Sequence, residues 1–326
     1  MARPAFILTI DTEGDNIWAR PERITTENAR FLPRFQNLCR EFGLKPTYLA
    51  NYEMVIDPRF SAFGESVLRD DAGEIGLHVH PWNSPPLDAG APDPRWHHLY
   101  LYEVPDGLLE AKIRHQTDLL RDTFGIQPKS HRAGRWGFDE RVARVLVEAG
   151  YDVDCSVTPG VSWKKHKGAP DGRGGPEYFG FPQDPYLLDL DNIRRRGESP
   201  MLEVPVTIRP NYGRAIERVH RAFRERWIGK RIRRVYGEPV SWLRPNGKNL
   251  DTLLSVVDWA IDRGSAVVEF MLHSSELMPG GSPTFETDEQ IEILYGHLER
   301  LFTHVASRGL VGQTLSEFRS AWASAI

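Results

Sequence analysis

Four short segments of the sequence carry side chains that could take part in catalysis. The first is DTEGD, residues 11–15, which follows the apolar run FILTI. Three carboxylates this close together repel one another and are costly to bury, and a bound cation relieves both problems. On an extended backbone Asp11 and Glu13 point to the same side, and Gly14 allows the chain to turn after them. The segment indicates a cation site, or else a polar loop that ends a strand.

The second segment is HVHPW, residues 78–82, which follows a predicted strand over 74–77. His78 and His80 point the same way on an extended chain, so one cation can bind both imidazoles. Two histidines and a carboxylate at strand ends form a metal site that leaves positions open for water. Two hydrogen-bonded structural histidines would produce the same pattern.

The third and fourth segments add an arginine and a further histidine. Residues 131–137 are HRAGRWG, in which Arg132 could orient a carboxylate through paired hydrogen bonds or form a purely structural ion pair. Residues 271–275 are MLHSS, in which His273 could act as a general acid. His131 is the alternative candidate for that acid.

Strands and helices alternate along the chain, which places the four segments in space. The predicted strands cover residues 6–10, 47–50, 74–77, 129–132, 151–156, 201–207 and 266–272, and the main predicted helices cover 27–42, 106–124, 139–149, 250–262 and 288–306. Such alternation is typical of an α/β protein with parallel strands and outer helices, and seven or eight units favour a barrel. All four segments would then meet at the carboxyl ends of the strands.

Two regions are predicted to be long loops within a single domain that covers residues 1–326. They lie near residues 83–105 and 159–200, and their Pro- and Gly-rich parts, 83–95 and 159–185, should wall the catalytic face. A third region, 209–234, is strongly basic and is predicted to form an amphipathic surface helix. A site for an anionic glycan or a phosphate-bearing lipid headgroup is the alternative for it.

The composition excludes several classes of protein. The 326 residues include 41 Lys and Arg against 45 Asp and Glu, a formal net charge of −4, so a nucleic-acid partner is not expected. The two cysteines, Cys39 and Cys155, lack metal-like spacing and are expected to be reduced thiols. The sequence shows neither a signal peptide nor a membrane span, which predicts a cytoplasmic protein without expected peripheral membrane contact. The oligomeric state cannot be inferred.

The ordered set of motifs resembles the polysaccharide deacetylase superfamily, the NodB-like proteins of carbohydrate esterase family 4. The matching segments are TID at 9–11, EIGLH at 74–78, RAGRWG at 132–137, DCS at 154–156 and LH at 272–273. This resemblance implies a distorted (β/α)7-type barrel. It also implies metal-dependent hydrolysis of an N-acyl group, expected to be N-acetyl, on a sugar or glycoconjugate intermediate.

The resemblance implies a role for each matching residue. Asp11 would be the general base, Arg132 would tether it, and His273 would be the acid that protonates the leaving amine. His78 and His80 would bind one divalent metal ion, expected to be zinc, with cobalt, nickel or manganese as alternatives.

Two departures from the usual motifs concern the metal ligands. Thr12 stands where the family commonly has a second aspartate, so the acidic ligand must be Glu13, Asp15 or Asp11 itself. We favour Glu13, because it shares a face with Asp11. The histidines are two residues apart rather than four, which indicates a divergent subgroup with D-x-E and H-x-H motifs. Two other functions stay open: an amide hydrolase of a non-sugar substrate, and a degenerate barrel that binds glycan without turnover.

Overall fold

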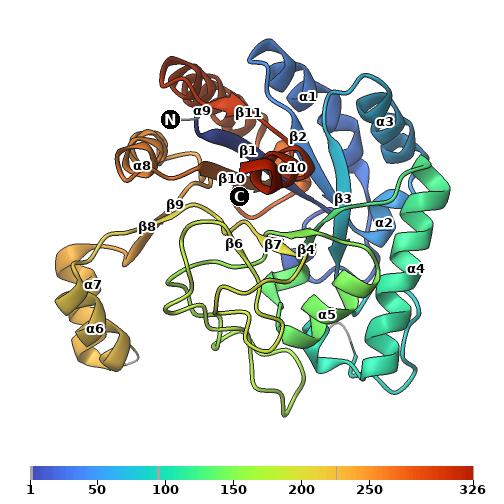
Figure 1. Ribbon diagram of the computed structural model, residues 1–326, viewed down its shortest axis with the longest axis horizontal. Coiled ribbons are helices and arrows are strands. Elements are labelled where there is room, and N and C mark those ends of the chain that lie inside the picture. Colours follow the sequence, from blue (N-terminus) through green and yellow to red (C-terminus); the bar gives the residue numbers. More distant parts are fainter. Residues whose placement is uncertain (1–2, 94–95, 225, 326) are drawn as a thin grey trace.

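A curled, mostly parallel β-sheet forms the centre of the computed structural model, which describes residues 3–93, 96–224 and 226–325 (Figure 1). Its strand order is β10-β1-β2-β3-β4-β5-β7-β6, with β11 beside β1; only β6 is antiparallel to its neighbour. The strands are β1 (Ala5–Thr12), β2 (Pro46–Ala50), β3 (Glu74–Val79), β4 (Ser130–Ala133), β5 (Val153–Asp154), β6 (Tyr186–Leu187), β7 (Leu202–Glu203), β10 (Val267–His273) and β11 (Val311–Gly312).

An irregular segment after β7 closes the gap between β7 and β10. The Thr207 N–H donates to the Glu269 carbonyl at 3.2 Å, and the Glu269 N–H donates to Thr207 Oγ1 at 2.8 Å. The strand predicted over 201–207 covers only Leu202–Glu203, but Thr207, the last residue of the predicted strand, is hydrogen-bonded to Glu269 of β10. In the described chain the seven parallel strands on the path from β10 to β7 curl around one interior, with β11 added in parallel beside β1, and the predicted distorted (β/α)7-type barrel is confirmed.

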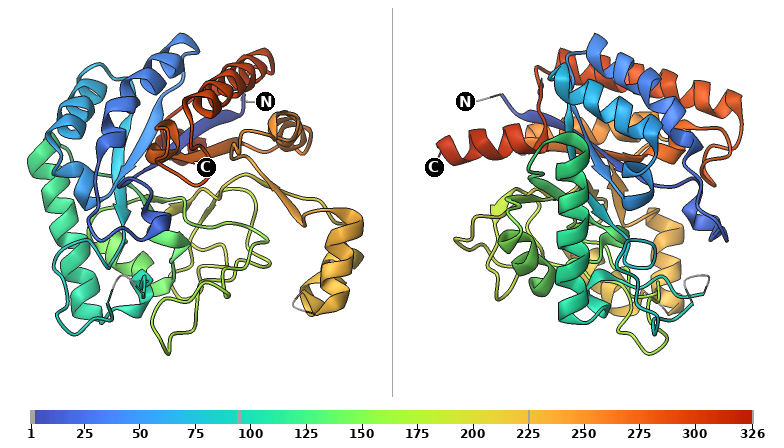
Figure 2. Two further views of the ribbon diagram at one scale, coloured as in Figure 1. Left: turned by 180° about the vertical axis from the view of Figure 1, so that it is seen from behind. Right: turned by 90° about the vertical axis from the view of Figure 1, so that its right-hand side faces the viewer.

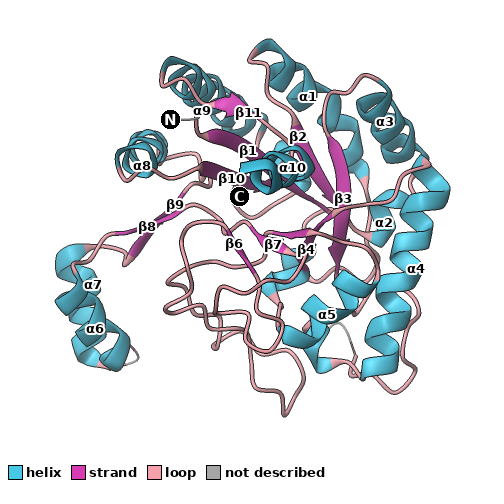
Figure 3. Cartoon of the chain, in the orientation of Figure 1, coloured by secondary structure: helices cyan, strands magenta, loops and turns pink. Residues whose placement is uncertain are grey.

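Helices cover the outside of the curled sheet (Figure 3). They are α1 (Leu32–Glu41), α2 (Tyr52–Val55), α3 (Pro58–Arg69), α4 (Asp106–Phe124), α5 (Glu140–Glu148), α8 (Leu250–Asp262) and α9 (Asp288–Ser307). The helix predicted over 27–42 is divided into a 3-10 helix, Glu27–Phe31, and α1, because Pro33 fits only in the first turn of an α-helix. No helix in the described parts of the chain is long and apolar enough to span a bilayer.

The side chains that point into the barrel form layers along its axis. At the amino ends of the strands, apolar residues such as Ile7 and Val267 pack against Leu315 and Phe318 of α10 (Leu315–Ala325), which closes that end. Alternation along β1 then places Thr9 in a middle layer and Asp11 at the carboxyl end. The interior thus changes from apolar to charged toward the face where the candidate catalytic residues lie.

The basic segment extends away from the barrel (Figure 2). Two antiparallel strands, β8 (Ile208–Pro210) and β9 (Val240–Trp242), lead to the helices α6 (Arg214–Phe223) and α7 (Trp227–Tyr236). The predicted single helix is therefore a pair of helices; residue 225, between them, lies outside the described residues, as do 94 and 95 in the first long loop. None of the residues of α6 is buried. Several apolar side chains of this pair are exposed, among them Val219, Trp227 and Val235.

Candidate active site

Asp11 lies at the carboxyl end of β1 and is held there by Arg132 from β4. Arg132 Nη1 donates to Asp11 Oδ1 at 2.7 Å, while its Nη2 donates to Thr9 Oγ1 at 2.8 Å and to Glu269 Oε1 at 2.5 Å. The Arg132 side chain is completely buried, and its Nε donates to the Cys155 carbonyl. Every side of this guanidinium thus has a partner, as a buried charge requires.

The surroundings of Asp11 favour its ionised form. Burial alone would raise the pKa of its carboxyl group, but Arg132, His78 and His273 together outweigh burial and hold the pKa below its ordinary value. Asp11 Oδ1 is engaged by Arg132, which leaves Oδ2 directed toward the other candidate residues. An ionised, oriented carboxylate of this kind can accept a proton.

Glu13, His78 and His80 bring their side chains together beside Asp11. Glu13 Oε2 lies 2.7 Å from His80 Nε2 and 3.4 Å from His78 Nε2, and the two Nε2 atoms are 3.1 Å apart. All three residues are buried, and among the described residues the three ligand atoms contact one another, an arrangement that burial makes costly. The three atoms converge on one point.

The donor set fits a divalent metal ion. His78 Nδ1 lies 2.8 Å from the Arg132 carbonyl, and an Nδ1–H that donates a hydrogen bond to this carbonyl leaves the His78 Nε2 lone pair directed at the cluster. Glu13 Oε1 is buried and without a hydrogen-bond partner among the described residues. A carboxylate and two imidazoles, all buried, are ligands that zinc and related metals accept. Gly134 permits this packing, because a Cβ there would lie 2.4 Å from His80 Nδ1.

Asp15, the alternative acidic ligand, faces away from this cluster. Its carboxylate accepts hydrogen bonds from the backbone N–H groups of Glu27 and Asn28, at 2.8 and 2.9 Å, and from the Asn28 side chain. Asp15 therefore caps the start of the helical segment after the acidic loop. The geometry favours Glu13 as the acidic ligand.

His273, the last residue of β10, faces the carboxylates across the pocket. Its Nε2 lies 3.6 Å from both Asp11 Oδ2 and Glu13 Oε1. Its Nδ1 lies 3.0 Å from an Arg244 nitrogen and 3.3 Å from Glu276 Oε2, and Arg244 also donates to Glu276 Oε1 at 2.8 Å. This arrangement fixes the ring orientation and directs Nε2 into the pocket.

The pocket above these residues has a volume of about 360 Å³ and aromatic walls. The two predicted loops supply much of them: Trp82 stacks on His98 with ring centroids 4.2 Å apart, and Trp163 stacks on Trp136 at 6.2 Å. Trp18 contacts the His273 ring edge-on at 4.8 Å. Flat aromatic walls around polar groups suit the C–H faces of a sugar ring.

His131, the alternative acid, is absent from this pocket. It points outward from the barrel, is completely buried and has Asp154 Oδ2 at 2.6 Å from its Nδ1. Neighbouring strand residues point to opposite faces of a sheet, so Arg132 and His131 cannot both face the interior.

Sequence reasoning missed three residues that position the predicted ones: Glu269, Arg244 and Glu276. Glu269 interrupts the apolar strand VVEFML, and a charged residue in such a run implies a buried partner. Glu276 lies three residues after His273, a spacing that allows a contact across a helical turn. Arg244 carries no such signal, because it comes from the turn after β9.

Comparisons with known proteins show the fold of the chain. No family model matches it, and no curated protein sequence matches it. It is similar to a candidate polysaccharide deacetylase from Mycobacterium smegmatis, with a TM-score of 0.56 and 13% identity over 99% of this chain and 92% of that one. It is also similar to a candidate glycoside hydrolase or deacetylase from Parabacteroides distasonis, with a TM-score of 0.60 and 12% identity over 99% of this chain and 72% of that one.

A third structure shows that the same fold carries other chemistry. The 4-alpha-glucanotransferase from Thermococcus litoralis has a TM-score of 0.52 and 15% identity, over 98% of this chain and 40% of that one. The chain thus has the fold of the polysaccharide deacetylases, and the resemblance inferred from its motifs is confirmed at that level. Its activity must be argued from its own residues.

Proposed function

We propose that this protein is a metal-dependent hydrolase that removes an N-acetyl group from a sugar or glycoconjugate intermediate of the cytoplasm. The observation that carries the proposal is the placement of Asp11, fixed by Arg132, directly beside the Glu13–His78–His80 cluster. A base, a metal-ligand set and a facing histidine then share one pocket. Hydrolysis of an amide by metal-activated water can use these three elements together.

In this proposal each residue has one task. A divalent metal ion held by Glu13, His78 and His80 would polarise the acetyl carbonyl and favour attack by water. Asp11 Oδ2 accepts a proton from the attacking water as the new C–O bond forms. His273 Nε2 then donates a proton to the amide nitrogen as the C–N bond breaks, which releases acetate and a free amine.

The walls of the pocket support a sugar as the substrate. Trp82, Trp163 and Trp136 present aromatic surface, and Arg135 and His166 add polar groups at the same rim. Arg135 also lies over the Tyr100 ring at 4.2 Å, so its position is fixed by packing. A non-sugar amide would need less of this combined stacking and hydrogen-bonding surface.

Acetate release from N-acetylated monosaccharides and their conjugates tests the proposal, with metal content measured on the same preparation. We expect about one divalent ion per chain and acetate release that Asp11→Asn abolishes without loss of metal. Metal binding with no acetate release from any sugar, but hydrolysis of simple amides, would favour the non-sugar hydrolase. A protein that binds glycan yet holds no metal would be the degenerate barrel.

A further inference from the structure

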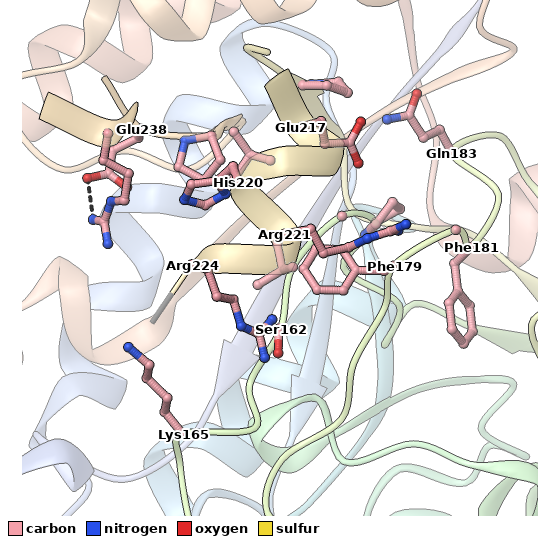
Figure 4. Close-up of a pocket in the computed structure, with 18 residues that line it drawn as sticks. Ser162, Lys165, Phe179, Phe181, Gln183, Glu217, His220, Arg221, Arg224 and Glu238 are labelled. Carbon is pink, nitrogen blue, oxygen red and sulfur yellow. Dashed lines mark hydrogen bonds and ion pairs between the residues drawn. The ribbon is translucent and has the colours of Figure 1, made fainter. Parts of the chain in front are cut away.

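A second pocket, of about 450 Å³, lies between the loop after β5 and the helix α6 (Figure 4). Figure 4 shows His220 and Arg221 of α6 and Arg224, directly after it, at this pocket, with Ser162 and Lys165 of the facing loop opposite. The candidate catalytic residues described above do not line it.

Most of the charged side chains that line this pocket, which we call the basic pocket, are cations. Lys165, Arg221, Arg224 and Arg233 line it, against two carboxylates, Glu217 and Glu238. The Glu238 carboxylate is engaged by Arg233 at 2.5 Å. The excess of positive charge in a protein whose net charge is −4 indicates an anionic ligand.

Aromatic packing holds the arginines at the wall of the basic pocket. The guanidinium carbons of Arg221 and Arg224 lie 5.4 and 5.5 Å from the centre of the Phe179 ring. Such packing reduces the conformational freedom that an arginine loses when it binds a ligand. Arg224 also lies 3.4 Å from Glu177, and the Arg221 guanidinium can bind two oxygens of a phosphate group at once.

His220 adds an unsatisfied polar atom to the same wall. Its Nε2 is buried and has no hydrogen-bond partner among the described residues. Burial, together with the Arg233 and Arg224 guanidiniums, lowers the pKa of its imidazole. An anion would offset this crowding of positive charge and could accept a hydrogen bond from the ring.

One segment of chain separates the basic pocket from the catalytic pocket. Trp163 and His166 line the catalytic pocket, whereas their chain neighbours Ser162 and Lys165 line the basic pocket. In β9, Val240 lines the basic pocket and Trp242 packs on Trp163 at 6.0 Å. The two pockets therefore border the same segment of chain, residues 162–166.

We propose that the basic pocket binds a phosphate or diphosphate group that is attached to the sugar substrate, while the acetylated end of that sugar enters the catalytic pocket. This assignment rests on the proposed deacetylase function. The volume exceeds that of one phosphate group, so a diphosphate or the first atoms of its carrier also fit. A nucleotide and a polyprenyl lipid present the same diphosphate chemistry.

The binding of inorganic pyrophosphate, measured by calorimetry, tests the site without relying on activity. Arg221→Ala and His220→Ala should each weaken binding at least tenfold. Arg231→Ala removes an exposed arginine of α7 that does not line the pocket, and it should change the affinity less than twofold. Binding that both pocket variants leave unchanged would overturn the proposal, because pyrophosphate would then bind elsewhere.

Acetate release from three forms of one N-acetylated sugar identifies the carrier: a nucleotide diphosphate conjugate, a polyprenyl diphosphate conjugate and the neutral methyl glycoside. Arg221→Ala should raise KM about tenfold for the conjugate that is used, with kcat within twofold, and should leave the methyl glycoside unaffected. An equal KM change for the methyl glycoside would overturn the assignment to phosphate. Pyrophosphate binding that depends on Arg221, without acetate release from any sugar, would support the anion site and contradict the deacetylase function.

Discussion

Arg132 joins two carboxylates that lie on different strands, with Nη1 2.7 Å from Asp11 and Nη2 2.5 Å from Glu269. One buried positive charge thus forms ion pairs with two acidic groups. Burial raises the pKa of Glu269 to about 7 in spite of Arg132, whereas Asp11 is held below its ordinary pKa. Asp11, which faces the pocket, is therefore ionised more readily than Glu269, which lies behind it.

Arg132→Lys should separate this orienting role from metal binding. A lysine keeps the charge but cannot bond Asp11, Thr9 and Glu269 at once, because its ammonium group is a single point. We expect kcat to fall about 100-fold and the free energy of unfolding to fall by about 3 kcal/mol, with metal content unchanged. Arg34→Lys, at an exposed ion pair with Glu292, is the control and should cost under about 1 kcal/mol. Unchanged kcat in Arg132→Lys would exclude the tethering role.

The acidic metal ligand can be identified by metal analysis of two variants. Glu13→Ala should lose the bound ion, because it removes one of three converging ligands. Asp15→Asn should keep the ion but unfold more easily, since the aspartate caps backbone N–H groups. His80→Ala should behave like Glu13→Ala. The reverse result, with metal lost only in Asp15→Asn, would show that the assignment of Glu13 is wrong.

The fold and the grouping of Asp11, Glu13, His78, His80, Arg132 and His273 followed from the sequence because they depend on local periodicity. Each of these residues lies near the carboxyl end of a strand or directly after it, and parallel strands bring their carboxyl ends together. Residues that act through long-range contacts could not be predicted this way. Arg244 reaches His273 from the turn after β9, and its contact depends on how an irregular segment closes the barrel.

Removal of His273 should alter the pH dependence of the reaction, and changing a residue that holds it should lower the rate. A general acid must be protonated, so kcat/KM should fall on the alkaline side, and His273→Ala should remove that limb of the profile. Glu276→Gln should retain the limb but lower kcat, because the variant weakens the contact that orients the imidazole. An alkaline limb that persists in His273→Ala would assign the acid to another group.

Glu53 should make the stability of the metal-free protein depend on pH. Its carboxylate accepts from the Gly14 N–H at 2.8 Å and from Asn83 at 3.0 Å, and it ties the acidic loop to the loop after β3. Burial raises the pKa of Glu53 to about 7 from 4.5. Between pH 4.5 and about 7 the folded protein keeps the Glu53 carboxyl protonated, whereas the unfolded chain releases the proton. The contribution of Glu53 to the free energy of unfolding is therefore present below about pH 4.5 and is lost as the pH rises toward 7.

Urea unfolding in the presence of a chelator, between pH 5 and 7.5, measures this contribution. Glu53→Gln should lose less stability than the unmodified protein as the pH rises. Glu65→Gln, at an exposed position in α3, is the matched control and should follow the unmodified protein. Identical pH dependence in all three proteins would exclude Glu53 as the titrating group.

The shape of the catalytic pocket predicts a preference for short substrates. Trp82 and His98 from one loop, and Trp163 and His166 from the other, enclose the space above Asp11. An open groove accommodates a long polymer, whereas walls on both sides suit one or two sugar units. We therefore expect kcat/KM for acetate release to be at least as high for mono- and disaccharide substrates as for longer chitin oligomers. His98→Ala removes a ring stacked on Trp82 and leaves the metal ligands in place. By opening one wall, it should raise kcat/KM for long oligomers relative to that for mono- and disaccharides. Activity that climbs with oligomer length and vanishes on the shortest substrates would show that the walls do not limit the substrate.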